Sequence, residues 1–328
     1  CGLQQYTDRI REEYEKINNF DKSQTGQLMN RYRKITLCKD CRYRGGINKP
    51  HCVGKMSGIA GTLMEGDGCS RGEDKEDIMR TIAIINLKGG VAKTTSSINI
   101  AYILTQRGYK VLLVDNDKQG DCSRGLNRRT QDGEGIDRIM VDRHPDMYKL
   151  IHHTDYVNLD IITANLGLLT ANMEVTMDRV RPQQNRLKKA LQQVSDRYDF
   201  CVVDNALTAA NDVLVPVEVD DNTLEGMNEL LDQIDEVQEE LNPDLENVRC
   251  FVTKYQKFNQ AHLQGAEVIK EQYPAMETKI RFSGVVARST FMRMPVALHS
   301  PRSAAAEDYE SLVNEYLNMI GDEDNGEI

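Results

Sequence analysis

The sequence predicts an α/β fold with a mostly parallel, doubly wound sheet, preceded by a small cysteine-rich segment. Two observations support this prediction. Short apolar runs suited to buried strands alternate from Met79 onward with longer stretches whose apolar residues recur at helical spacing. Strands that alternate with helices form parallel sheets covered on both faces. The chain has 328 residues, of which 40% are hydrophobic and 28% charged, enough to build such a core.

The predicted elements follow one another at regular intervals. The first strand covers residues 81–86 and the second covers 111–114, with a helix over 94–107 between them. That helix has one apolar face, and Gly108 follows it where a C-terminal cap belongs. Further strands are predicted at residues 159–163, 200–204, 212–217, 248–253 and 279–286. Further helices are predicted at residues 184–197, 224–241, 261–272 and 303–319.

We expect two parts, residues 1–78 as an appendage with a helix over residues 6–17, and residues 79–328 as the main domain. Met79 has the sequence context of a natural start, so the appendage is either an added module or translated read-through. Because the chain begins with Cys1, we expect a fragment or a processed product. Its polar first residues do not have the pattern of a signal peptide. No apolar run reaches the roughly 18 residues of a membrane span.

The cysteines suggest a zinc site in the appendage. A C-x-x-C turn with two further thiolates could satisfy tetrahedral Zn²⁺, and His51 could replace one of them. The alternative is a set of free thiols in a loop. Eight cysteines are too few for a disulfide scaffold, so we expect reduced thiols and a cytoplasmic protein. The candidate zinc ligands are Cys38, Cys41, Cys52 and Cys69. Predicted core cysteines are Cys122, Cys201 and Cys250, and predicted surface histidines are His144, His152 and His153.

The charge is distributed unevenly. The formal net charge is −10, yet residues 29–60 hold eight basic residues and one acidic residue, which gives +7 there and leaves −17 elsewhere. Such a basic stretch is either a contact for nucleic acid or another anion, or a solvated loop.

A phosphate-binding loop is the most specific signal in the chain. It lies between the first strand and the first helix, where small residues let backbone N–H groups turn toward a phosphate chain. Lys93 supplies a positive charge for the β and γ oxygens, and the Thr94 hydroxyl suits Mg²⁺. The alternative is a glycine turn without a ligand. The candidate binding residues are Lys88, Gly89, Gly90, Val91, Ala92, Lys93, Thr94 and Thr95.

These residues resemble the deviant Walker A motif, K-G-G-x-G-K-T-T, of the ParA/MinD ATPases, a P-loop NTPase family. Ala92 stands where the motif has glycine, and its methyl group is tolerable only at negative φ, so we expect altered phosphate approach. The segment VLLVDNDKQGD at residues 111–121 is similar to the family's V-D-x-D-P-Q-G-N. The segment YDFCVVD at residues 198–204 resembles its Walker B strand, and residues 212–217 and 295–309 resemble later family segments.

The resemblance implies Mg²⁺-dependent ATP hydrolysis in a nucleotide-sandwich homodimer of the ParA type, for partition of plasmid, chromosomal or mobile-element DNA. Lys88 would cross the dimer interface to the partner's ATP phosphates, as an arginine finger does. Asp117 would orient the attacking water and Asp115 would support that loop. Asp204 would hold Mg²⁺ through water. The alternative for Asp115 and Asp117 is a polar strand end.

The family resemblance also implies nonspecific, electrostatic DNA binding and a ParB-like activator protein, in a cytoplasmic, nucleoid-associated enzyme. A MinD-like membrane role does not suit the acidic ending GDEDNGEI. An iron–sulfur ATPase would place cluster cysteines in a pattern that this chain does not have. The candidate DNA-binding residues are Arg281, Arg288, Arg293 and Arg302, with Lys254 and Lys257 near them.

One feature departs from the family pattern. Only residues 205–211 separate Asp204 from Asp212, whereas a parallel crossover takes a dozen residues or more, usually with a helix. Seven extended residues reach at most about 25 Å, so the family's switch loop and most of its helix are missing. Either the protein has this deletion or residues are absent from the sequence. A real deletion would leave a sheet face uncovered. It would also favour a hydrolysis-impaired DNA-binding or scaffold protein.

Overall fold

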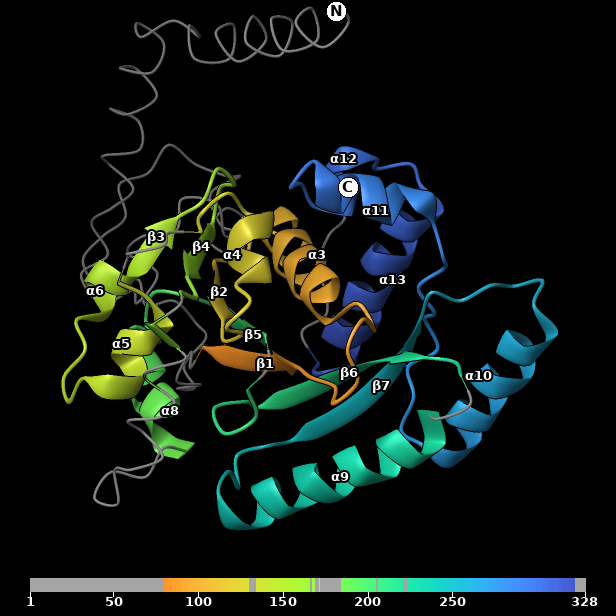
Figure 1. Cartoon of the computed structure of the whole chain (residues 1–328), viewed down its shortest axis with the longest axis horizontal. Helices are drawn as coiled ribbons and strands as arrows, with labels where there is room; N and C mark the ends of the chain where they lie inside the picture. Colours follow the sequence, from red (N-terminus) through yellow and green to blue (C-terminus); the bar gives the residue numbers. More distant parts are fainter. Residues whose placement is uncertain are drawn as a thin grey trace, which may run out of the picture. The chain divides into compact units, whose positions relative to one another are not determined.

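The computed structural model describes residues 79–129, 134–165, 167–168, 171, 184–204, 206–220 and 223–321. The chain divides into two units, residues 1–67 and 68–328, and every described residue belongs to the second. That unit holds one seven-stranded sheet in the order β3-β4-β2-β5-β1-β6-β7 (Figure 1). All neighbours pair in parallel except β3 and β4. The strands are β1 Arg80–Ile84, β2 Val111–Asp115, β3 Ile151–His153, β4 Leu159–Ile162, β5 Phe200–Asp204, β6 Asp212–Glu218 and β7 Asn247–Thr253.

Helices cover both faces of this sheet. One face packs against α3 and α13, and the other packs against α5, α6 and α8 over β2 and β5, and against α9 and α10 over β6 and β7. The doubly wound α/β architecture is therefore confirmed. The helices are α3 Lys93–Gln106, α4 Asp121–Gly125, α5 Ile136–Val141, α6 Met147–Leu150, α8 Gln184–Gln192, α9 Thr223–Glu240, α10 Gln260–Gln272, α11 Gly284–Phe291, α12 Val296–His299 and α13 Ala304–Met319.

Strand β2 shows why its sequence is apolar throughout. Val111 and Leu113 face the α3 side, whereas Leu112 and Val114 face the α8 side, and all four are fully buried. Side chains alternate along a strand, so a strand covered on both faces has no solvent side for polar residues. The polar residue that ends it, Asp115, lies at the edge of the sheet where parallel strands finish.

The strand predicted at residues 279–286 is wrong. Its second half begins α11, and its first half forms only a single bridge between Arg281 and Tyr255. The Ser283 side chain accepts a hydrogen bond from the Val285 amide, which starts a helix in place of extended chain. The other predicted strands and helices among the described residues are present with shifted ends. The short elements β3, α4, α5, α6 and α12 were not predicted.

The short connection between β5 and β6 does not expose the sheet. It crosses β1 and is fastened there, since the Asn211 amide donates to the Thr81 carbonyl at 2.8 Å and the Asn211 side chain accepts from the Thr81 amide at 2.8 Å. Buried Asn242 donates to the carbonyl of Ala210 at 2.7 Å. Ala83 beneath the connection is fully buried. The expected loss of cover is therefore wrong at this position, because Ala83 is buried in one apolar cluster with Ala210 of the connection.

Several smaller predictions have clear outcomes. Cys122, Cys201 and Cys250 are buried free thiols, as predicted. His153 is exposed and contacts Asp160 at 2.7 Å. Within the described part of the chain, no helix has both the length and the hydropathy to cross a membrane. The helix predicted at residues 6–17, the basic stretch at 29–60 and the candidate zinc ligands lie outside the described residues, so these stay predictions, as does the boundary at residue 78.

Candidate nucleotide site

The predicted phosphate loop joins the end of β1 to the start of α3 (Figure 1). The first residue of α3 is Lys93, and the residue before it makes no side-chain cap hydrogen bond. Gly90 has φ +79° and is exposed. The first amides of a helix have no partner inside the helix, and they carry its positive end. An anion placed at this turn would satisfy them.

Ala92 does not have the negative φ that its methyl group was expected to require. Its φ is +71°, in the left-handed region, where the methyl group of an L-residue is crowded. The loop has therefore kept the backbone geometry of a glycine motif, with a strained residue at its last position. Left-handed conformation at a non-glycine residue costs roughly 1–2 kcal/mol.

The two lysines of the loop are held by acceptors within it and beside it. The Lys93 ammonium donates to the Lys88 carbonyl at 3.0 Å. The Lys88 ammonium forms an ion pair with Asp220, which follows β6, and its amide donates to the Asn86 side chain at 2.8 Å. Both ammonium groups are partly exposed to solvent. A triphosphate at the loop would compete with these acceptors for the same charges.

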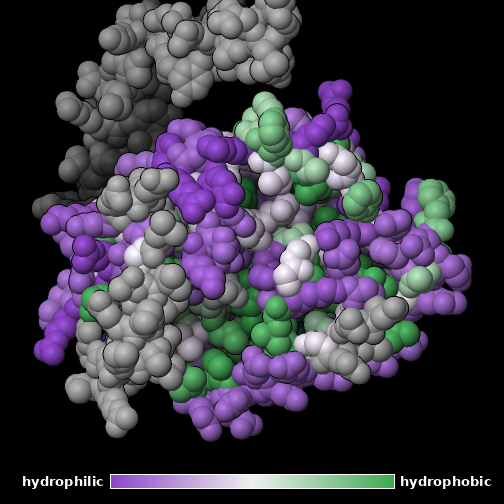
Figure 2. Space-filling model, viewed as in Figure 1, coloured by the Kyte–Doolittle hydropathy of each residue, from purple (hydrophilic) through white to green (hydrophobic). Residues whose placement is uncertain are grey.

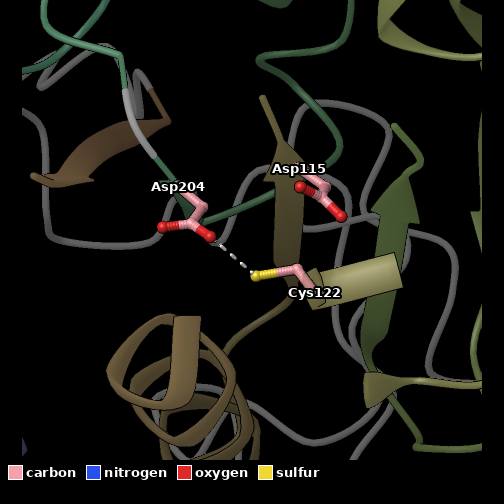
Figure 3. Close-up of side chains that lie close together, drawn as sticks. All are labelled: Asp115, Cys122 and Asp204. Atoms are coloured by element: carbon pink, nitrogen blue, oxygen red, sulfur yellow. Dashed lines mark hydrogen bonds between the residues drawn. The ribbon is translucent and has the colours of Figure 1, made fainter. Parts of the chain in front are cut away.

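Two buried carboxylates lie opposite the first turn of α3, at the ends of neighbouring strands. Asp115 ends β2 and Asp204 ends β5, and the two are paired in register. The Thr94 hydroxyl donates to Asp204 at 3.0 Å and the Ser97 hydroxyl donates to its other oxygen at 3.3 Å. Figure 3 shows the Cys122 sulfur, at the start of α4, pointing at Asp204 from 3.3 Å.

Burial governs the protonation of this cluster. It raises the pKa of Asp115 to about 6, although the amide and hydroxyl of Ser123 both donate to that carboxylate. It also raises the pKa of Asp204, against hydrogen bonds from Cys122 and Thr94. Burial and the nearby carboxylates hold the pKa of Cys122 well above its usual range, so this residue is a neutral thiol donor.

These residues fit a divalent cation. The ligand atoms of Asp115, Cys122 and Asp204 lie within 4.8 Å of one another. Burial makes each carboxylate costly in its charged form, and a cation beside them would offset that cost. The Thr94 hydroxyl and the Asp204 carboxylate are oxygen donors of the kind that Mg²⁺ prefers. The Cys122 thiol is a softer ligand and suits Mg²⁺ poorly.

Sequence reasoning did not place Cys122 in this cluster. It read the residue as an ordinary core cysteine, which its burial bears out, but its partner is a carboxylate rather than an apolar side chain. The available signal was its position directly after the segment at residues 111–121, which supplies the two candidate site carboxylates Asp115 and Asp117.

Asp117 lies at the entrance to the cluster rather than inside it. It is half-buried, its amide donates to Asp115 at 3.3 Å and its carboxylate accepts from the Gln119 amide at 2.9 Å. Gly120 ends this turn with φ +63°. Because β1 and β2 both run parallel to β5, the turn that follows β2 lies at the same end of the sheet as the phosphate loop that follows β1.

The candidate DNA-binding arginines fall into two groups. Arg288, Arg293 and Arg302 are exposed on and beside α11 and α12. Arg281 instead binds Asp308 through its guanidinium at 2.6 Å and also donates to the Ala304 carbonyl at 3.1 Å. Its charge is thus neutralised within the fold. The same is true of Lys254, which pairs with Glu218 at 2.7 Å, whereas exposed Lys257 lies over the Phe258 ring.

Comparison with known proteins identifies the family. A family model described as an AAA domain matches residues 79–247, which include the phosphate loop and both buried carboxylates. The sporulation initiation inhibitor protein Soj of Bacillus subtilis is 34% identical over 249 residues, which span 72% of this chain and 97% of Soj. The chain belongs to the ParA/Soj family of partition ATPases.

Other relatives agree with this assignment. The chromosome partitioning protein ParA of Caulobacter vibrioides is 30% identical over 259 residues, which span 74% of this chain and 96% of that ParA. Among solved structures, cobyrinic acid a,c-diamide synthase of Mycobacterium smegmatis, with a bound ATP analogue and magnesium, has a TM-score of 0.65 at 24% identity. That match covers 74% of this chain and 96% of the synthase, and it shows the shared fold.

Proposed function

We propose that this ParA/Soj-family chain binds ATP with Mg²⁺ and hydrolyses it in order to partition DNA. The observation that carries the proposal is the uncapped start of α3, where the Thr94 hydroxyl donates to the buried Asp204 carboxylate. A helix N-terminus attracts phosphate oxygens, and the two oxygen ligands beside it suit a cation that phosphate would share. The magnesium-containing structure of the M. smegmatis synthase, which has the same fold, supports this choice of cofactor.

Each residue of the site has a proposed task. Lys93 would leave the Lys88 carbonyl and neutralise the β- and γ-phosphates, while residues 88–95 contact phosphate through their backbone. Thr94 would ligate Mg²⁺ directly, and Asp204 would hold it through water. When bound, Mg²⁺ would neutralise charge that develops on the phosphate oxygens. Asp117 would orient the attacking water, and Asp115 would fix the Asp117 turn through the hydrogen bond already present.

Lys88 has a proposed task in a homodimer. Its ion pair with Asp220 would open so that its ammonium could reach the ATP of a second copy. A half-exposed pair of this kind is worth only about 0–1 kcal/mol, so binding energy at the dimer interface would suffice to open it. The dimer would then bind DNA without sequence preference, and a ParB-like activator protein would stimulate turnover.

A second candidate function rests on the β5–β6 connection. Residues 206–211 carry no helix, and they are anchored by Asn211 and Asn242. A segment fastened in this way has little freedom to rearrange around a phosphate. The chain would then bind ATP and DNA but turn ATP over slowly, as a hydrolysis-impaired scaffold.

ATP turnover by the full chain, with and without DNA, separates the two candidates. DNA-stimulated turnover supports the enzyme, whereas ATP binding without turnover supports the scaffold. Under both, Lys93→Ala should weaken ATP binding by at least tenfold, because the phosphates lose their principal charge partner. Lys149→Ala, a change at an exposed lysine on α6, is the control and should leave binding intact. Unchanged ATP affinity in Lys93→Ala would contradict the site.

A further inference from the structure

Residues 279–303 form a segment of one charge. They hold Lys279, Arg281, Arg288, Arg293 and Arg302, and no aspartate or glutamate, in a chain whose net charge is −10. Three of these arginines are exposed. Three exposed arginines on a protein of acidic net charge are suited to contact a polyanion.

The same segment exposes large apolar side chains. Phe291, the last residue of α11, is 86% exposed, and Met292 beside it is 48% exposed. Hydrophobic groups stand out among hydrophilic ones near the region of α11 and α12 (Figure 2). Arg288 and Arg293 flank the pair along the chain. Phe291 and Met292 together form the apolar tip of this segment.

The backbone of the apolar tip is held firmly. The amide of Met292 donates to the Arg288 carbonyl at 2.9 Å, and the amide of Met294 donates to the Ser289 carbonyl at 3.0 Å. Ser289 is buried. Below the tip, Val296 is fully buried, and its amide donates to the Asn99 side chain of α3 at 2.7 Å. The tip is therefore a rigid projection attached to the helix that begins at the phosphate loop.

Charge and shape together favour one kind of partner. A second copy of this surface, brought up by a two-fold axis, would place arginine against arginine. Helices of eight and four residues are short for an amphipathic membrane anchor. Duplex DNA offers phosphates to arginines, and it also accepts Phe or Met between base steps in the minor groove. A single projecting pair fits such an insertion better than a platform of spaced aromatics for unpaired bases.

We propose that the apolar tip is a wedge that enters the minor groove of duplex DNA and partly unstacks one base step, while Arg288, Arg293 and Arg302 contact the flanking phosphates. The inference rests on the DNA binding in the proposed function and adds a contact to the bases themselves. The wedge would add to that otherwise nonspecific binding a modest preference for deformable pyrimidine–purine steps such as TA, because they are the easiest to unstack.

The test uses the full chain with ATP and magnesium, and a duplex that carries 2-aminopurine beside a central TA step. Unstacking raises 2-aminopurine fluorescence, so DNA bound by the unchanged protein should become brighter. Phe291→Ala should abolish most of that rise and weaken binding roughly tenfold, the size expected for one lost base contact. The dependence of binding on salt should stay unchanged, since the arginines remain. Val157→Ala is the matched control, because Val157 is an apolar side chain that is 82% exposed outside the basic segment.

The possible results are distinct. Binding without any fluorescence rise, or a rise that Phe291→Ala leaves intact, would overturn the wedge while DNA binding survives. No DNA binding by the unchanged protein would refute that part of the proposed function itself. Binding to anionic phospholipid vesicles that Phe291→Ala removes, with no effect on DNA, would assign the tip to membranes and overturn the proposal. Unchanged thermal unfolding of Phe291→Ala would show that its fold is intact.

Discussion

At the scale of single residues, Ala92 shows how the phosphate loop accommodates a methyl group where the family motif has glycine. The residue keeps a left-handed φ of +71° at the junction with α3. Local strain of this kind persists when the surrounding structure fixes the backbone, and it is common at binding sites. The neighbouring hydrogen bond from the Ser96 amide to the Ala92 carbonyl, 2.9 Å long, is one such constraint.

Ala92→Gly should stabilise the ligand-free chain by about 1 kcal/mol, because glycine adopts this φ without steric cost and the gain exceeds its greater entropy when unfolded. Urea unfolding followed by circular dichroism measures the change. Ala261→Gly, at an exposed position of α10, is the matched control, and it should destabilise by up to about 1 kcal/mol. Destabilisation by both substitutions would mean that the φ at Ala92 is not strained.

At the scale of elements, a buried charge network joins the ends of β1, β6 and α13. Asp212 is fully buried and accepts hydrogen bonds from Arg80 at 2.6 and 2.8 Å, from Tyr316 at 2.7 Å and from Asn247 at 2.8 Å. The Asp212 carboxylate, in β6, thus satisfies donors from three other elements, β1, β7 and α13. Since β6 follows the short connection, this network fixes where that strand begins.

Asp212→Asn should destabilise the chain by about 2–4 kcal/mol, because it leaves the Arg80 guanidinium without its buried counter-charge. Glu246 is the other acidic partner of Arg80, and its side chain is 59% exposed. Glu246→Gln removes that charge and should lower the free energy of unfolding by under about 1 kcal/mol. Denaturant midpoints of the two variants give the comparison. Equal effects would show that burial of the pair contributes nothing to stability.

At the scale of the whole molecule, the acidic net charge opposes the proposed DNA binding, whereas a few exposed arginines favour it. The acidic net charge would repel a duplex, so the proposed DNA binding would depend on the exposed residues Arg288, Arg293 and Arg302. Binding that depends on phosphate contacts releases counterions and weakens steeply with salt.

With three phosphate contacts per protomer, from Arg288, Arg293 and Arg302, the logarithm of the DNA association constant should fall with the logarithm of salt at a slope of about −3 for each protomer. Replacing one of them with glutamine should reduce the slope by about 1. Lys149→Gln, remote on α6, should leave it unchanged. Fluorescence anisotropy across a salt series provides the measurement, and a flat dependence would exclude these contacts.

Local sequence pattern predicted most of the strands and helices and the position of the phosphate loop between β1 and α3, because both depend on neighbours along the chain. The helix at residues 284–291 was missed, since its capping serine outweighed a short apolar run. The contact of Cys122 with Asp204 and the neutralisation of Arg281 by Asp308 became visible only in the folded chain. Such pairs lie tens of residues apart, and no local periodicity encodes which side chains a parallel sheet brings to the same edge.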